Sequence, residues 1–393
     1  MPLLQSSVQE VSTQSNPDDQ ISAQPRGLQT VAHEANTCAP GNPIVDVARS
    51  GKSNKIQGAI KCTISLTAVL CLGAMWFGWM APVLADNPPK PPAAEPSSRL
   101  EPIRPIPLEI SVNLQKAALG ERLFHDPRLS GDGNVSCASC HDLALGGTDQ
   151  RKYSAGVNGA LGSINAPTVF NSAGNFRQFW DGRAATLEEQ IDGPIHAKAE
   201  MGSSWPEIIP RLQEVPEYAA AFQSIYSGTI QPAHVKDAIA EFERSLTTPN
   251  SRFDQYLRGD DNAITADEKE GYRKFKSYGC VSCHQGVNVG GNMFATLGAM
   301  DDYFAERGSV DKADHGRFNV TGKEEDRFVF KVPSLRNVGL TAPYLHDGSA
   351  KTLDRAVAIM GRFQLGRHIP PQDLELIVKF LETLTGQYKG KSL

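Results

Sequence analysis

The sequence predicts an all-α, loop-rich protein whose folded part divides into two domains, and three observations lead to this prediction. Apolar residues recur at helical spacing through residues 100–393, where strand-like alternation of polar and apolar residues is almost absent. Stretches rich in glycine, such as 286–298, separate the helical patterns. The pattern Cys-x-x-Cys-His occurs twice, which divides the region at about residue 249 into segments 100–249 and 250–393.

Length, charge and cysteine usage narrow the class of protein. The chain has 393 residues, enough for two or three domains. Its net charge of −5, with acidic and basic residues well mixed, gives no indication of nucleic-acid binding. Four of the seven cysteines belong to the Cys-x-x-Cys-His motifs and the other three lie near the N-terminus. The folded part therefore has no cysteines to spare for a disulfide framework.

The N-terminal region predicts export of the folded part. Residues 1–58 are polar and predict a disordered extension. Residues 59–85 contain an apolar run that ends in the small-residue site Val83-Leu84-Ala85, which predicts a signal peptide. The alternative is an uncut membrane anchor, because the run approaches the ~20 residues that span a bilayer. Residues 86–99 form a Pro-rich linker. We expect the folded part in the periplasm, attached to the inner membrane only if the segment stays uncut.

Helix patterns are clear at three places in the folded part. One apolar stripe covers residues 235–246, with large apolar side chains at helical spacing. Thr265 and Glu268 form a capping box at the start of another helix. A third stripe covers residues 374–384 and predicts a last helix that ends near Gly386. We expect the last two of these helices to cross.

The repeated motif predicts covalent haem attachment. Two thiols can add to the vinyl groups of one haem while the following histidine binds the iron. A zinc ribbon is one alternative, but the pairs lie too far apart in sequence, and a redox Cys-x-x-Cys does not need histidine at both sites. We expect two c-type cytochrome domains, each with one covalently bound haem c. The attachment and ligand residues are Cys137, Cys140 and His141 in the first motif, and Cys280, Cys283 and His284 in the second.

Four further segments resemble the bacterial dihaem cytochrome c peroxidases, a family related to MauG. They are LGERLFHDPRLS at 119–130, FWDGRAA at 179–185, DHGRF at 314–318 and PYLHDG at 343–348. The resemblance extends over about residues 110–386. It implies that segment 100–249 holds a low-potential, peroxidatic haem and segment 250–393 a high-potential, electron-transfer haem. It also implies that the two haem groups are bridged at the domain interface.

The resemblance implies a role for several single residues. Glu200 matches the distal acid–base residue of the family, Gln190 a distal-pocket amide, and Trp180 the tryptophan between the haem groups. Without the resemblance, a lone glutamate would be read as solvated and a lone tryptophan as part of the core. Met360 matches the sixth ligand of the second haem iron, with Met293 and Met300 as competitors. Three more residues match an interdomain calcium site: Asn165, Thr341 and Pro343.

One position departs from the family pattern. Many of these peroxidases carry a histidine that caps the resting peroxidatic iron, and the matching position here is Val157. Valine cannot bind iron, so we expect the first haem to be open or water-bound even in the fully oxidised enzyme. His196 is the nearest histidine that could substitute. The MauG-related enzymes share this departure, but they carry tyrosine where this chain has Met360.

Together these features predict a peroxidase that reduces hydrogen peroxide to water. The expected electron donor is a small periplasmic protein such as a cytochrome c or a copper protein. The alternative is a MauG-like enzyme that oxidises tryptophans of a partner protein to form a quinone cofactor. A plain electron carrier is disfavoured, because it needs neither Glu200 nor an open iron. The resemblance also implies a homodimer and a bound Ca²⁺.

Overall fold

The computed structural model describes residues 100–393, which lie within one compact unit. The expected extension at 1–58, the signal peptide or anchor at 59–85 and the linker at 86–99 lie outside the described residues. Within residues 100–393, no helix is both long enough and apolar enough to cross a membrane.

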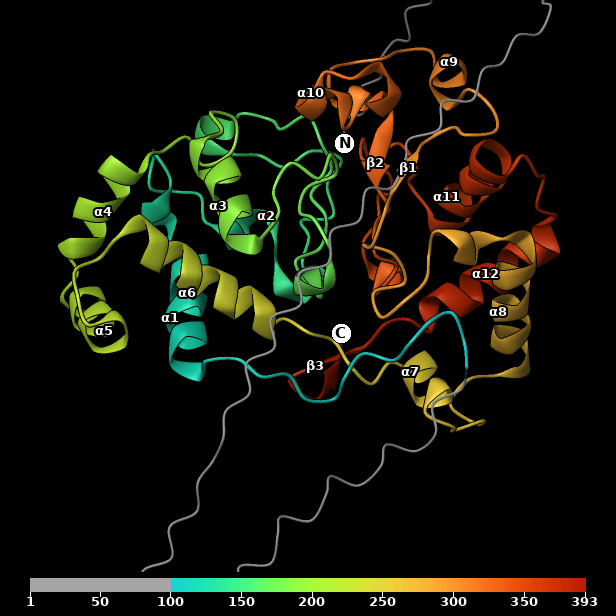
Figure 1. The fold of residues 1–393 in the computed structure, drawn as a ribbon, viewed down its shortest axis with the longest axis horizontal. Coiled ribbons are helices and arrows are strands. Elements are labelled where there is room, and N and C mark those ends of the chain that lie inside the picture. Colours follow the sequence, from blue (N-terminus) through green and yellow to red (C-terminus); the bar gives the residue numbers. More distant parts are fainter. Residues whose placement is uncertain (1–99) are drawn as a thin grey trace, which may run out of the picture. The chain divides into compact units, whose positions relative to one another are not determined.

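The described chain is rich in helix and poor in sheet, as the sequence predicts (Figure 1). The helices are α1 (Leu114–Phe124), α2 (Cys137–Cys140), α3 (Leu187–His196), α4 (Trp205–Gln213), α5 (Pro216–Tyr226), α6 (Pro232–Ser245), α7 (Arg252–Leu257), α8 (Ala266–Tyr278), α9 (Tyr303–Arg307), α10 (Phe318–Thr321), α11 (Leu353–Ile359) and α12 (Pro371–Glu382). Two small antiparallel pairs were not predicted: β1 (Phe294–Thr296) with β2 (Val329–Lys331), and β3 (Gln387–Tyr388) with β4 (Lys391–Ser392).

The three predicted helices are confirmed, with small corrections at their C-terminal ends. The capping box at the start of α8 is present: the Thr265 hydroxyl accepts from the Glu268 amide, and the Glu268 carboxylate accepts from the Thr265 amide at 2.7 Å. Helix α6 ends at Ser245, so Leu246 is its C-cap rather than its last turn. Helix α12 ends at Glu382, so Leu384 lies beyond it.

Two helix crossings repeat the same local geometry. In the first, α1 crosses α6 where a Cβ added to Gly120 would lie 1.9 Å from the carbonyl oxygen of Ala238. In the second, α8 crosses α12 where a Cβ added to Gly271 would lie 1.9 Å from the carbonyl oxygen of Leu376. Only glycine permits such close backbone approach. The predicted crossing of α8 and α12 is therefore confirmed, and α1 and α6 form a counterpart in the other half of the chain.

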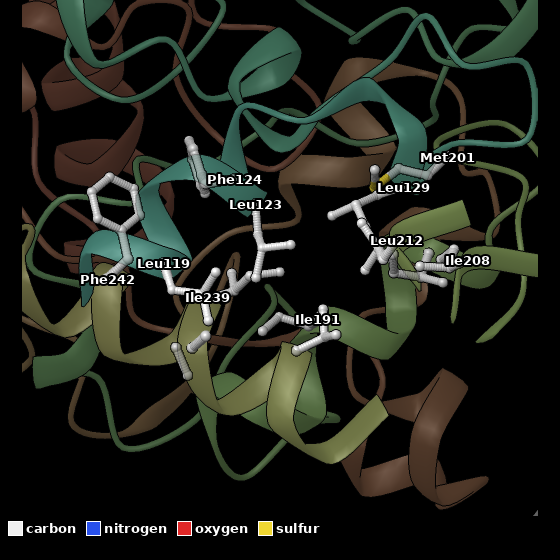
Figure 2. Packing of buried hydrophobic residues seen from close by; sticks show 14 of the residues in the cluster. Leu119, Leu123, Phe124, Leu129, Ile191, Met201, Ile208, Leu212, Ile239 and Phe242 are labelled. Carbon is white, nitrogen blue, oxygen red and sulfur yellow. The ribbon is translucent and has the colours of Figure 1, made fainter. Parts of the chain in front are cut away.

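Separate hydrophobic clusters surround the two Cys-x-x-Cys-His motifs. The first draws its side chains from α1, α3, α4, α5 and α6, and Cys137 packs against it. Figure 2 shows Leu123, Ile191 and Ile239 meeting between α1, α3 and α6. The second cluster draws on α7, α8, α11 and α12, and Cys280 packs against it. The domain limits at residues 249 and 250 stay a prediction.

Candidate active site

The second motif lines a cavity of about 590 Å³. Cys280, Cys283 and His284 lie on its wall together with apolar side chains from α8, α11 and α12. The Nδ1 atom of His284 lies 3.2 Å from the carbonyl oxygen of Val289, which leaves Nε2 to bind a metal. Burial lowers the pKa of His284 to about 4 and keeps the imidazole in its neutral, metal-binding form. The donor set, the largely apolar lining and the volume fit a haem group.

Two methionines reach this cavity. Met360 begins the π-helical turn Met360–Gln364 that follows α11, and it packs against the cluster around Phe363. Met300 also lines the cavity, but 64% of its surface is exposed. Met293 is not among the residues that line it. Met360 is half-buried and so the less exposed of the two methionines that line the cavity, and its role as a sixth iron ligand stays a prediction.

The first motif has the same hydrogen-bond arrangement as the second. Its cysteines begin and end α2, and the Nδ1 atom of His141 lies 3.3 Å from the carbonyl oxygen of Gly147. Burial lowers the pKa of His141, so this imidazole is also neutral with Nε2 left to bind. Burial raises the pKa of the Cys137 thiol to about 12, as expected for a sulfur packed against apolar side chains. These residues fit a second haem group.

Glu200 lies close to the first motif in the loop after α3. Burial raises the pKa of its carboxyl group, and the positive charge of Arg183 only partly opposes this effect. The charge of Glu200 also helps to raise the pKa of Cys140. A carboxyl group with a raised pKa near a haem-binding motif is suited to accepting and returning a proton. Gln190, the predicted distal amide, is half-buried on α3.

Val157 holds the Glu200 loop in place. Its amide donates to the carbonyl oxygen of Glu200 at 2.8 Å, and its side chain is buried in the first hydrophobic cluster. Gly156 lies so close that an added Cβ would be 2.1 Å from the carbonyl oxygen of Ala199. The side chain at position 157 is thus used for packing. His196, the other candidate, is exposed, with Nδ1 3.2 Å from the carbonyl oxygen of Ser203.

Trp180 and the calcium candidates lie together. The indole nitrogen of Trp180 donates to the carbonyl oxygen of Asn165 at 3.0 Å. Asn165, Thr341 and Pro343 line the same cavity as Trp180 and His284. The structure therefore brings these sequence-predicted residues to one place, while the calcium role of three of them stays a prediction.

Comparison with known proteins agrees with this geometry. The family described as "Di-haem cytochrome c peroxidase" matches residues 114–262. Cytochrome c551 peroxidase of Nitrosomonas europaea is 45% identical over 325 residues, which cover 82% of this chain and 91% of the relative. The chain belongs to the dihaem cytochrome c peroxidase family. The predicted resemblance is confirmed.

Two other proteins similar to this dihaem peroxidase bear on its function. Cytochrome c peroxidase Ccp of Escherichia coli is 51% identical over 294 residues, which cover 75% of this chain but 63% of the relative. The chain thus matches less than two thirds of that protein's length. A crystal structure of a MauG-like protein associated with microbial copper homeostasis superposes with a TM-score of 0.64 at 29% identity, covering 74% of this chain and 94% of that protein.

Sequence reasoning missed two buried charged residues near the haem-binding motifs. Lys331, in β2, lines the cavity of the second motif and is 7% exposed. Glu243, on α6, is buried close to Cys137, and burial raises its pKa to about 8. The sequence context of both residues indicated that they could be buried. Glu243 follows Ile239 by one helical turn on the apolar face of α6, and Lys331 interrupts an apolar run.

Proposed function

We propose that this protein is a periplasmic cytochrome c peroxidase, which reduces hydrogen peroxide to water with electrons from a small cytochrome c or copper protein. One observation carries the proposal: the two motifs share a histidine arrangement but differ in what lies beside them. Glu200, a carboxyl group with a raised pKa, lies near the first motif, whereas Met360 lines the cavity of the second. A peroxidatic centre needs an acid–base group such as Glu200, and an electron-transfer centre needs a strong iron ligand such as Met360. Relatives named cytochrome c peroxidase support the same activity.

The two motifs would each hold one covalent haem c, with His141 and His284 as proximal ligands. Haem iron supplies the redox chemistry at both sites. Overall, hydrogen peroxide, two electrons and two protons give two molecules of water. Each histidine is kept neutral by burial and oriented by the backbone carbonyl that its Nδ1 faces.

Glu200 would move the proton during cleavage of the O–O bond. It accepts a proton from one peroxide oxygen and returns it to the leaving oxygen. Gln190 would help to orient peroxide in the same pocket. Because Val157 cannot bind iron, the first site stays accessible without prior reduction of the second.

The second site would receive electrons and pass them on. Met360 would be the sixth iron ligand, which raises the reduction potential of a haem. Trp180 would lie between the haem groups and carry electrons toward the first site. Its hydrogen bond to Asn165 would link it to a Ca²⁺ ion held by Asn165, Thr341 and Pro343. We further propose that the protein acts as a homodimer.

A MauG-like activity is the second candidate. Val157 and the structural similarity to a MauG-like protein favour it. Met360 favours the peroxidase, because MauG-related enzymes carry tyrosine at this position. The discriminating result would be a partner protein whose tryptophans become oxidised.

The test is steady-state oxidation of reduced cytochrome c by hydrogen peroxide, with enzyme purified fully oxidised and never reduced beforehand. We expect rapid turnover, and we expect Glu200→Gln to lower kcat by roughly 10²–10⁴-fold. Absence of turnover even after reduction would contradict the peroxidase and favour partner oxidation. Turnover only after reduction would contradict the open first site.

A further inference from the structure

Lys331 is a buried cation in the cavity of the second Cys-x-x-Cys-His motif. It is the last residue of β2, a strand whose three residues are all buried, and only 7% of its surface is exposed. Its backbone amide donates to the carbonyl oxygen of Trp180 at 2.7 Å. Lys331 therefore lies beside both the tryptophan and the cavity that holds Cys280, Cys283 and His284.

No carboxylate of the described residues pairs with this lysine. The acidic groups around β2 are already paired: Asp181 contacts Arg183 at 2.8 Å, and Asp326 lies 3.8 Å from Arg317. Asp314 contacts His346 and Arg307. Burial lowers the pKa of Lys331 to about 8, with no opposing contribution from a nearby anion.

A buried ammonium group without a partner is unfavourable, so the site calls for an anion supplied from outside the described chain. The cavity fits a haem group, and the anions that a haem carries are its two propionates. We propose that Lys331 is the counter-ion of a propionate of the haem bound at Cys280 and Cys283, and that its charge raises the reduction potential of that haem. This inference rests on the proposed haem attachment.

The direction of the effect follows from charge. Reduction removes one positive charge from the iron, so a fixed cation nearby favours the reduced state, and neutralising a propionate acts in the same direction. Lys331 would thereby add to the effect of Met360 in making this the high-potential site. Electrons from the donor would then collect at the second haem.

The test is a spectroelectrochemical titration of the holoprotein and three variants. Lys331→Met removes the charge with little change in length, Lys331→Arg keeps it, and Lys323→Met removes an exposed lysine charge as a control. We expect Lys331→Met to lower the equilibrium constant for reduction of the second haem at least about tenfold, which is ~59 mV for one electron. Lys331→Arg and Lys323→Met should stay within about twofold of the unmodified protein.

Three results would overturn the proposal: no shift in Lys331→Met, an equal fall in Lys331→Arg, or a larger shift at the first haem than at the second. Covalent haem is measured on the same samples by mass spectrometry of peptides 280–284. If no haem is attached there, the proposed function fails. If haem is attached and the potential is unchanged, only the role of Lys331 fails.

Discussion

Replacement of Gly271 by alanine tests the helix crossing on which the second haem-binding motif depends. The new Cβ would lie 1.9 Å from the carbonyl oxygen of Leu376, whereas ordinary contact begins at 3.4 Å. Helices α8 and α12 would have to separate by up to 1.5 Å (3.4 minus 1.9). That movement would disturb the packing of Phe275 and Tyr272 against Phe380, whose ring centroids lie 5.1 and 4.9 Å apart.

The expected cost can be worked out from two opposing effects. Overpacking of a tight interface costs up to about 3 kcal/mol. Alanine regains about 1 kcal/mol over glycine within a helix. The net loss in the free energy of unfolding is about 2 kcal/mol, which lowers the melting temperature by roughly 4–8 °C if the half that contains the crossing unfolds as a unit of about 150 residues.

Thermal melting of the holoprotein, followed by circular dichroism, measures the effect. The control is Gly228→Ala, where the nearest atom to the new Cβ is the carbonyl oxygen of Tyr226 at 3.8 Å. We expect the control to melt within about 2 °C of the unmodified protein, because alanine there meets only ordinary contacts. Equal melting temperatures for the two variants would refute the idea that the crossing requires glycine. Gly120→Ala should behave like Gly271→Ala.

Further predictions concern the two proposed haem sites. Activity should fall at low pH as Glu200 becomes protonated, and burial raises the pKa of this carboxyl group. Arg183→Met removes a positive charge that lowers this pKa, so the variant should have a higher pKa at Glu200. The acid limb of its kcat/KM profile should therefore move to higher pH. The fully oxidised protein should show a high-spin iron signal in electron paramagnetic resonance, and Val157→His should reduce that signal. A resting spectrum with low-spin iron alone would contradict an open first site. Met360→Leu should lower the reduction potential of the second haem in a redox titration, whereas Met300→Leu should leave it unchanged. An equal fall in potential in the two variants would contradict the choice of Met360 over Met300 as the iron ligand.

The start of α8 was easier to predict from the sequence than the ends of α6 and α12. The start of α8 depends on a local exchange of hydrogen bonds between Thr265 and Glu268, which four residues specify. The ends of α6 and α12 were placed too late because Leu246 and Leu384 are fully buried although they lie beyond the helices. An apolar stripe reports burial, and burial continues after the helical backbone stops. The pair β1 and β2 was not predicted, because the three residues of β2 are all buried and so show no alternation of polar and apolar residues.

The candidate site shows a similar division between local and distant information. The Cys-x-x-Cys-His motifs are local, so the sequence alone located the two histidines that we propose as proximal ligands. Glu200 was identified only through family resemblance, because its raised pKa comes from burial in the folded chain. Lys331 gave a weak signal for the same reason: nothing in the sequence says that β2 is buried on both faces or that the nearby carboxylates pair with other cations.

The two halves of this protein use one scaffold for two proposed tasks, so the difference between them must lie in a few side chains. Each half crosses two helices at a glycine, and each turns its histidine so that Nδ1 faces a backbone carbonyl. These shared features would hold the two proposed haem groups, but they do not distinguish the roles of the two sites. Near the first motif Val157 fills the apolar cluster and Glu200 lies close to Cys140, whereas the second cavity is lined by Met360 and by Lys331, which pairs with no carboxylate of residues 100–393. A haem iron that has no sixth protein ligand and lies near an acid–base group is suited to chemistry on peroxide. A haem iron with a methionine ligand and a nearby cation is suited to holding an electron. On this reasoning, exchanging these few residues should alter the division of labour before it alters the fold.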